Sequence, residues 1–157
     1  MKYTSQRIAW LFFATCMLLL VLQLVYGFIM GFAHMGMDGL HDLIPFNTAR
    51  AVHTNLLVVW LLSGFMGAAY WIIPEECERE LASPKLAVVQ WASLVLVGVV
   101  AIIGFHVNWR EGRKFLEIPR PLDVLVVINV LVFVGNIGWT IKARSSISTN
   151  LPKRGRM

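Results

Sequence analysis

Apolar residues fall into four long runs that are separated by short polar segments. The runs cover about residues 8–32, 49–73, 86–107 and 122–141. Each run is long enough to cross a hydrocarbon core of roughly 30 Å, because a helix rises about 1.5 Å per residue and about 20 residues suffice. The pattern therefore predicts an all-α integral membrane protein with four transmembrane helices.

Residues with known end preferences mark the borders of these runs. Asn47 is a candidate cap for the second helix, Ser83 followed by Pro84 is typical of the start of the third, and Pro121 suits the first turn of the fourth. Pro74 is expected to end the second helix. The short connections predict one membrane domain over residues 1–157, in which residues 142–157 form a polar, basic and disordered tail.

Composition agrees with a membrane location. The chain is 57% hydrophobic and only 15% charged, which is outside the usual range of soluble domains. The first run is too long for the core of a secretion signal, which has roughly 7–15 residues. Cys16 and Cys77 lie far apart in the sequence and indicate neither a disulfide framework nor a zinc site.

Lysine and arginine are distributed unevenly between the two ends of the predicted helices. Nine of the 14 lie at the N-terminal end, and five lie at the opposite end, namely Arg50, Arg110, Arg113, Lys114 and Arg120. By the positive-inside rule, both termini are expected to be cytoplasmic. The net charge of +5 is accounted for by this membrane topology and requires no nucleic-acid partner.

The segment NTARAVHTNLLVVW, residues 47–60, carries His53 and Arg50 at the start of an apolar run. The two residues are three positions apart, so on a helix they share a face at the outer end, where the basic loop 108–121 also lies. An imidazole beside cationic groups suits a haem, which has a central iron and two propionates. Two simpler interpretations stay open: the histidine bonds a neighbouring helix or interfacial water, and the arginines contact lipid headgroups.

A longer stretch resembles a known family. RAVHTNLLVVWLLSGFMGAAYWIIPEE, residues 50–76, is similar to the second helix of the catalytic subunit of cytochrome c-dependent nitric oxide reductases, within the haem–copper oxidase superfamily. The segments IPFNTAR, ELASPKLA, GRKFLEIP and NIGWTI continue the match in order, from about Val25 to Ile141. The core RxxHTN also fits cbb3-type oxidases, whereas GFMGAAYWIIPEE favours the nitric oxide reductases.

The resemblance implies a fold like the first four helices of that subunit, in a bacterial inner membrane. It implies that His53 is one axial ligand of a low-spin haem b that receives electrons from a cytochrome c subunit. It further implies that Arg50, Arg113, Lys114 and Glu117 lie near the haem propionates or a calcium ion. The family reduces two NO molecules to N2O and water at a second haem and a non-haem iron.

Two departures from the family limit what this chain is expected to do. The four helices lack the second haem b ligand and the residues for the second haem and the non-haem iron, so we expect a truncated or split segment that is not catalytic alone. Lys114 replaces an acidic residue of the family motif, and its ammonium group is a candidate substitute for the calcium ion.

A rival interpretation uses His106, which lies at about the depth of His53 on the third predicted helix. The two histidines could clamp one haem in an autonomous membrane cytochrome b. A purely structural membrane protein is the remaining alternative.

Two further patterns receive structural interpretations. The acidic run PEECERE, residues 74–80, is interpreted as a solvated turn. Gly27 with Gly31 forms a GxxxG pattern typical of close helix packing.

Overall fold

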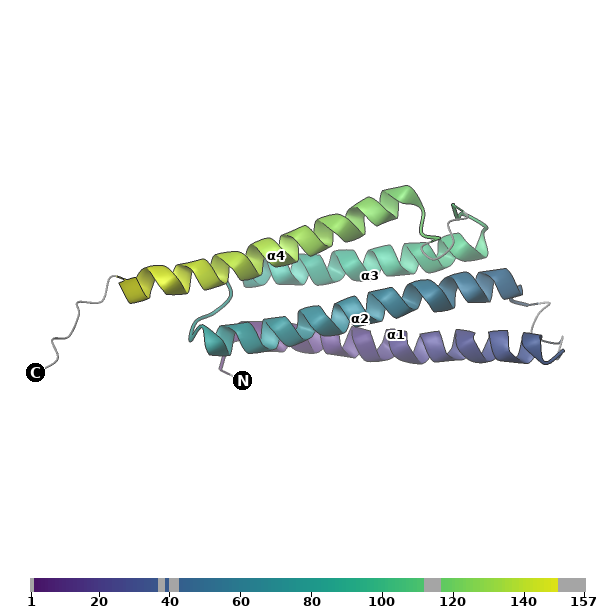
Figure 1. Cartoon of the computed structure of the whole chain (residues 1–157), viewed down its shortest axis with the longest axis horizontal. Helices are drawn as coiled ribbons and strands as arrows, with labels where there is room; N and C mark the ends of the chain where they lie inside the picture. The colour runs from purple at the N-terminus through teal and green to yellow at the C-terminus, as the bar shows by residue number, and fades with distance from the viewer. Residues whose placement is uncertain (1, 37–38, 40–42, 112–116, 150–157) are drawn as a thin grey trace, which may run out of the picture.

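Four helices form an antiparallel up-and-down bundle in the computed structural model of the chain. The structure describes residues 2–36, 39, 43–111 and 117–149, the last six of these without their side chains. The helices are α1 (Thr4–His34), α2 (Phe46–Glu76), α3 (Pro84–His106) and α4 (Arg120–Thr149), and the described part contains no strand. The start of α1 and the end of α4 lie at the same end of the bundle (Figure 1).

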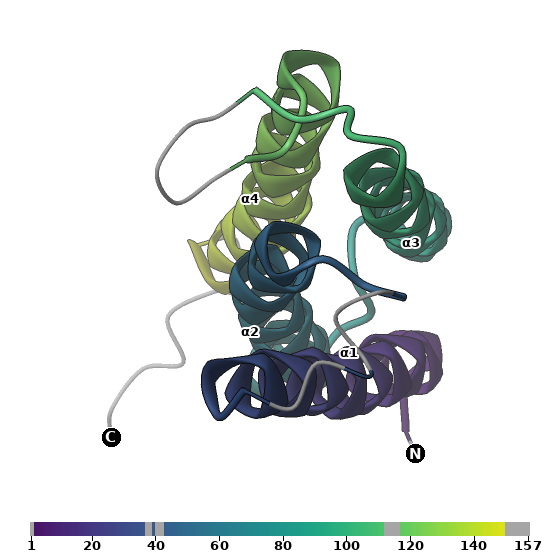
Figure 2. The ribbon, with the colours of Figure 1, turned by 90° about the vertical axis from the view of Figure 1, so that its right-hand side faces the viewer.

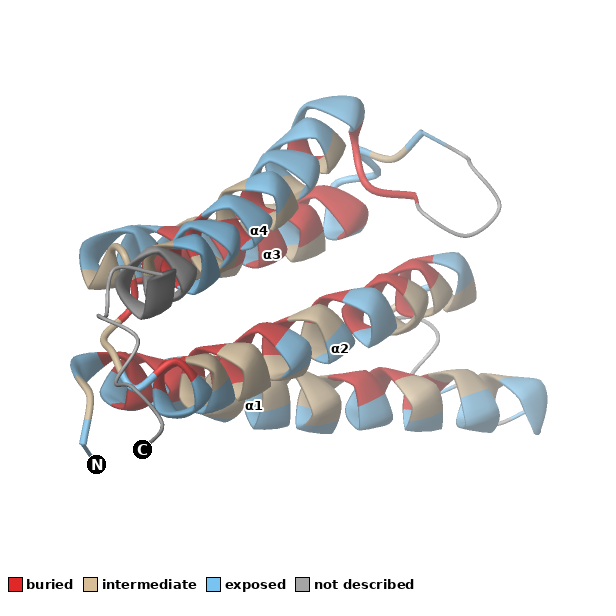
Figure 3. Ribbon diagram, turned by 60° about the vertical axis from the view of Figure 1, so that its left-hand side comes forward, coloured by how far each residue is buried: buried red, intermediate tan, exposed pale blue. Residues whose placement is uncertain are grey.

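All four predicted membrane helices are confirmed as helices that are long and apolar enough to span a membrane. They exceed the predicted runs: α1 and α2 have 31 residues each, which corresponds to about 46 Å of helix. Large apolar side chains such as Leu18, Phe65 and Leu131 are exposed. Exposed positions, pale blue in Figure 3, occur along all four helices. An apolar surface of this extent fits a lipid environment, and the chain is a multi-pass membrane protein.

The helix ends agree only in part with the sequence-based predictions. Ser83 caps α3 as expected, since its Oγ accepts a hydrogen bond from the Leu86 N–H at 3.3 Å, and Pro84 occupies the first turn. The predicted cap of α2 is wrong: α2 begins after Pro45, whose carbonyl accepts from Thr48 N–H at 2.9 Å, and Asn47 lies within the helix. A proline fixes the backbone φ in a range that suits a helix start, and among the described residues no side chain caps α2.

Two helices, α2 and α4, continue beyond the ends that the sequence predicts for them. Pro74 does not end α2, which continues to Glu76, because a proline in the last turn removes only one ladder hydrogen bond and Cys77 N–H still donates to the Ile73 carbonyl at 2.9 Å. Residues 142–149 of the predicted tail are helical in α4. The remainder of the predicted tail, 150–157, lies outside the described residues.

The helices α1 and α2 make the most extensive contact in the bundle. A side chain at Gly67 would meet the Phe12 Cβ at 3.0 Å, and one at Gly64 would meet the Cys16 Sγ at 3.0 Å. Ser63 Oγ also donates to the Phe12 carbonyl at 3.0 Å. Small residues therefore allow these two backbones to approach closely, as is common in membrane bundles.

Polar side chains join α3 and α4 to the rest of the bundle. Asn136 exchanges two hydrogen bonds with the Ser83 backbone, both at 3.0 Å, and Thr140 Oγ1 accepts from Ala82 N–H at 2.9 Å. Deeper in the bundle, Gln90 accepts from the Tyr70 hydroxyl and donates to the Asn129 carbonyl at 2.9 Å. Such bonds fix the helix register because lipid offers the same groups no partner.

The α1–α2 and α3–α4 pairs are less tightly joined than the helices within the first pair. Viewed along the bundle, α3 and α4 lie on one side of α2 and α1 on the other (Figure 2). An apolar cavity of about 420 Å³ lies between α1 and α3 and is lined by residues such as Leu22, Leu94 and Val99. Buried side chains join the two pairs toward both ends: Val52 of α2 shares a cluster with Phe105 of α3 at the outer end, and Tyr70 of α2 contacts Phe133 of α4 toward the other end. The candidate site lies at the outer end.

The acidic turn has a structural role that the sequence analysis missed. Glu80 Oε2 accepts from Thr4 N–H at 2.6 Å, and Glu80 Oε1 accepts from Ser5 N–H at 3.2 Å and from Leu81 N–H at 2.9 Å. The carboxylate thus satisfies the first N–H groups of α1 from a distant loop, where negative charge also complements the helix dipole.

Glu80 should make stability depend on pH. Desolvation raises the pKa of its carboxyl, but hydrogen bonds from Ser5, Leu81 and Thr4 outweigh it, so the pKa lies below its ordinary value. A lowered folded-state pKa stabilises the protein fully above the unfolded-state pKa, and this contribution is lost as the pH falls through the folded-state pKa. We expect thermal unfolding in detergent, measured by circular dichroism from pH 7 to pH 3, to lose stability at the acid end.

The matched variants are Glu80→Ala and Glu78→Ala, because Glu78 is an exposed carboxylate of the same turn. Glu80→Ala should cost about 1 kcal/mol at pH 7, as the loss of a helix cap does, and should flatten the pH dependence. Equal pH profiles in the two variants would contradict the assigned role.

Candidate functional site

His53 lies in the second turn of α2, and its ring faces α1. Its Nδ1 is 2.9 Å from the backbone carbonyl of Gln23. A carbonyl can only accept a hydrogen bond, so Nδ1 carries a proton, and in the neutral imidazole Nε2 then carries the lone pair. Among the described residues, Nε2 has no hydrogen-bond partner. The half-buried ring therefore presents an unprotonated nitrogen that is available to a ligand.

Gln23 holds α2 through both its backbone and its side chain. While its carbonyl accepts from His53, its Oε1 accepts from Trp60 Nε1 at 2.5 Å. Gln23 is only 7% exposed. Sequence reasoning did not select this residue, although a lone glutamine in the middle of an apolar run was the signal that could have found it.

Arg50 lies one helical turn before His53, at the same end of α2. Its guanidinium is 2.7 Å from Glu117 Oε1, and the glutamate side chain is 6% exposed whereas that of the arginine is 40% exposed. The structure thus brings together two of the predicted site residues. Arg113 and Lys114, the other two predicted members of this group, lie outside the described residues.

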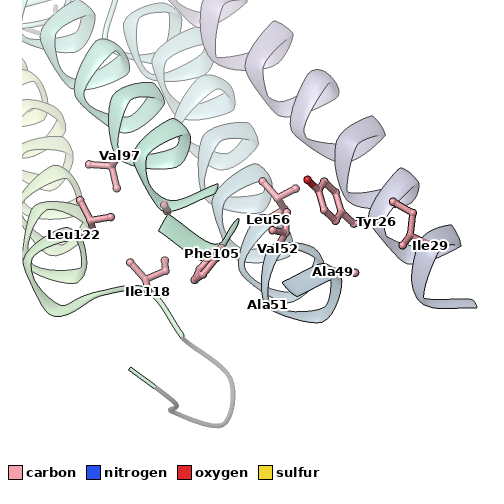
Figure 4. Packing of buried hydrophobic residues seen from close by; sticks show 11 residues of the cluster. Tyr26, Ile29, Ala49, Ala51, Val52, Leu56, Val97, Phe105, Ile118 and Leu122 are labelled. Carbon is pink, nitrogen blue, oxygen red and sulfur yellow. The ribbon is translucent and has the colours of Figure 1, made fainter. Parts of the chain in front are cut away.

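The segment that carries Glu117 is anchored by apolar packing. Ile118 and Leu122 belong to one buried cluster with Phe105 of α3 and with Val52 of α2. In Figure 4, Phe105 is seen between Ile118 and the α2 residues at the outer end of the bundle. This packing holds the carboxylate of Glu117 over the first turns of α2, beside Arg50.

Two other cations of the outer loop also have local partners. Arg120 Nε is 2.8 Å from Glu111 Oε2, and Arg110 donates to Asn108 Oδ1 at 2.5 Å. Charge in the described part of this loop is therefore partly balanced within the loop.

His106 differs from His53 in one respect. Its Nδ1 is 2.9 Å from the Ile102 carbonyl, so it has the same tautomer as His53, but its Nε2 is 3.2 Å from the Tyr26 hydroxyl. Tyr26 therefore donates to the lone pair that an iron atom would need. This arrangement does not favour the pairing of His53 and His106 around one haem.

The described residues contain no group of three or more histidine, cysteine or acidic side chains arranged to hold a metal ion. His53 is thus a single donor, and any metal bound there needs further ligands from another source. A haem fits this donor set, because the porphyrin supplies four nitrogen ligands and the protein supplies only the axial positions.

Comparison with known proteins decides the family. Residues 7–153 match the family model described as Cytochrome C and Quinol oxidase polypeptide I, COX1. The chain belongs to the COX1 family. The predicted membership of the haem–copper oxidase superfamily is therefore confirmed, and COX1 membership implies haem and iron cofactors in general terms.

Two relatives of this COX1-family chain come from Stutzerimonas stutzeri. A nitric oxide reductase subunit is 41% identical over 170 aligned positions, which cover 99% of this chain and 36% of the relative. Cbb3-type cytochrome c oxidase subunit CcoN1 is 26% identical over 98 positions, which cover 59% of this chain and 20% of the relative. The chain thus spans about a third of the length of the more similar relative.

The Arg50–Glu117 ion pair should stabilise the COX1-family bundle measurably. The glutamate is buried and the arginine is partly exposed, so the pair lies between a weak surface ion pair and a strong buried one. We expect a coupling free energy on the order of 1 kcal/mol. A double-mutant cycle with Arg50→Met and Glu117→Gln, followed by denaturant unfolding in detergent, measures it.

The Arg120–Glu111 pair provides the matched control, because its arginine side chain is 82% exposed. The cycle with Arg120→Met and Glu111→Gln should give little coupling, since water screens this pair. The assignment fails if the two cycles give the same coupling free energy.

Proposed function

We propose that this chain forms part of a nitric oxide reductase-type large subunit and contributes His53 as one axial ligand of a low-spin haem b. The observation that carries the proposal is the state of the His53 ring. Its Nδ1–H is bound to the Gln23 carbonyl, and its Nε2 lone pair is free among the described residues. This is the arrangement typical of metal-bound histidine, whose second nitrogen is oriented by a carbonyl or carboxylate acceptor.

The residues of this end of the bundle fit the group that is proposed. His53 would hold the iron through Nε2, and Arg50 would face the anionic propionates from the same side of α2. A haem held by two axial histidines supplies one-electron transfer between its ferrous and ferric states. In the protein, the Gln23 carbonyl keeps the His53 ring in one tautomer.

Glu117 adds a constraint to the charges near the propionates. It already pairs with Arg50, and it is the acidic residue expected near a calcium ion. We assign Arg50, Arg113, Lys114 and Glu117 to the propionate region, with haem b as the cofactor. Lys114 is expected to replace calcium there, because an ammonium group can neutralise a propionate directly.

The complete reaction needs residues beyond these four helices. Two NO molecules, two electrons and two protons give one N2O and one H2O, and the second haem b ligand, the second haem and the non-haem iron are expected on further helices of the large subunit. A cytochrome c-type subunit is the expected electron donor. The expected location is a bacterial inner membrane, with both termini in the cytoplasm because lysine and arginine concentrate at that end.

The first test is a reduced-minus-oxidised visible spectrum of the full chain in detergent, with haem b and imidazole added. Imidazole serves as the second axial ligand that the proposal assigns to another helix. We expect one low-spin haem b per chain in the original protein and loss of the low-spin signal in His53→Ala, because the free Nε2 is removed.

His106→Ala is the matched control, since His106 has the same tautomer but an occupied Nε2. It should retain the haem. Loss of the haem in both variants, with a bis-histidine spectrum in the absence of imidazole, would instead establish the autonomous cytochrome b. Retention of the haem in His53→Ala would overturn the assignment of His53.

A second test concerns calcium. We expect metal analysis to find no stoichiometric calcium in the original chain and calcium binding after Lys114→Glu, because this change restores an acidic residue in the loop. One calcium per chain in the original protein, lost on Glu117→Ala, would contradict the replacement by lysine.

A further inference from the structure

Gly27 of α1 lies directly against the His53 ring. A Cβ atom added at this glycine would stand 3.0 Å from His53 Cε1 and 3.1 Å from His53 Nδ1. Both distances are shorter than ordinary van der Waals contact between such atoms, which is about 3.5–4.0 Å between carbons. The ring is not at the end of a long flexible side chain, so it would have to rotate or move away from α1 to admit a methyl group.

The position of this glycine relative to Gln23 explains why the ring can come so close. In an α-helix, the carbonyl of residue 23 points toward residue 27 and accepts its N–H. A side chain at residue 27 would stand beside this carbonyl and restrict access to its second lone pair. Without a side chain, the carbonyl is open to a donor from another helix, and His53 Nδ1 occupies this opening at 2.9 Å.

The hydrogen bond at this opening determines which nitrogen of His53 can bind iron. With an acceptor at Nδ1, the proton stays on Nδ1 and Nε2 keeps its lone pair. Without that acceptor, the Nδ1–H would be unpaired at the edge of a low-dielectric bundle, which is unfavourable. The ring would then be free to carry its proton on Nε2, where it blocks metal binding.

We propose that Gly27 is a positioning residue for His53: its missing side chain opens the Gln23 carbonyl to Nδ1–H and so keeps Nε2 available for iron. The inference rests on the proposed function for the identity of the ligand. The positioning role concerns only residues of this chain. The protonated nitrogen of the His53 ring can therefore be measured in the protein without haem.

Other glycines at or near the α1–α2 interface serve as controls that distinguish the positioning of His53 from general helix packing. Gly67 is equally tight, since an added Cβ would lie 3.0 Å from Phe12 Cβ, but it touches no part of the candidate site. Gly31 lies one turn after Gly27 on α1 and has open space around it, so of the predicted GxxxG pattern only Gly27 is in close contact.

The experiment compares Gly27→Ala, Gly67→Ala and Gly31→Ala in the full chain, in detergent micelles or lipid nanodiscs. Histidine ¹⁵N NMR of the protein without haem reports which ring nitrogen carries the proton, and His53→Gln assigns the signal. Titration with haem b in the presence of imidazole then gives the haem affinity and the midpoint potential.

Gly27→Ala should convert His53 wholly or partly to the Nε2–H form and lower the haem affinity by about 10–100-fold, the usual effect of losing the partner that orients a metal ligand. The midpoint potential of the haem that still binds should rise, because a less basic imidazole stabilises the ferric state less. Gly67→Ala should lower the unfolding temperature and leave the His53 signal unchanged, and Gly31→Ala should change neither.

Two outcomes would overturn the inference. The first is a His53 signal in Gly27→Ala that is the same as in the original chain. The second is an equal change in Gly67→Ala, because the tautomer would then follow α1–α2 packing in general. If the tautomer changes only in Gly27→Ala but the original chain binds no haem through His53, the positioning role stands and the proposed function fails.

Discussion

The close approach of α1 to α2 is the constraint on which the outer end of the molecule depends. Glycine at three points of this interface allows side chains of one helix to meet the backbone of the other. One of these contacts places the His53 ring against the Gln23 carbonyl. A bundle in lipid gains little from the hydrophobic effect between helices, so short-range packing and interhelical hydrogen bonds hold such a pair together.

Polar groups in this bundle are satisfied by partners from distant segments. Glu80 caps α1 from the α2–α3 connection, and Asn136 of α4 binds the backbone of that same connection. Together, the hydrogen bonds of Glu80 and Asn136 hold the α2–α3 connection against α1 and α4, at the end of the bundle where α1 and α3 begin. At the other end, Glu117 binds Arg50, so the connection that precedes α4 is joined to the start of α2. Between the ends, Gln90 bonds both Tyr70 and the Asn129 carbonyl, whereas the cavity between α1 and α3 is lined almost entirely by apolar side chains.

The contrast between His53 and His106 shows how a single neighbour determines the chemistry of a histidine. Both rings donate from Nδ1 to a backbone carbonyl, and both lie near the outer end of the bundle. The Tyr26 hydroxyl uses the Nε2 lone pair of His106, whereas no described residue uses that of His53. Depth in the membrane and residue type do not distinguish the two positions, and the difference arises from which α1 side chain faces each ring.

The sequence by itself determined the four helices and their alternation, because a run of apolar residues about as long as the membrane is thick has few other stable structures. It also determined that Arg50 and His53 share a helix face, since helical periodicity depends only on their spacing. The motif around His53 was sufficient to indicate the family that the comparison confirmed. Only the tertiary structure decided that Glu117 pairs with Arg50, that Glu80 caps α1, and that Nε2 rather than Nδ1 of His53 is free. Each of these depends on which groups from separate helices come within hydrogen-bond distance, and local sequence patterns do not specify that.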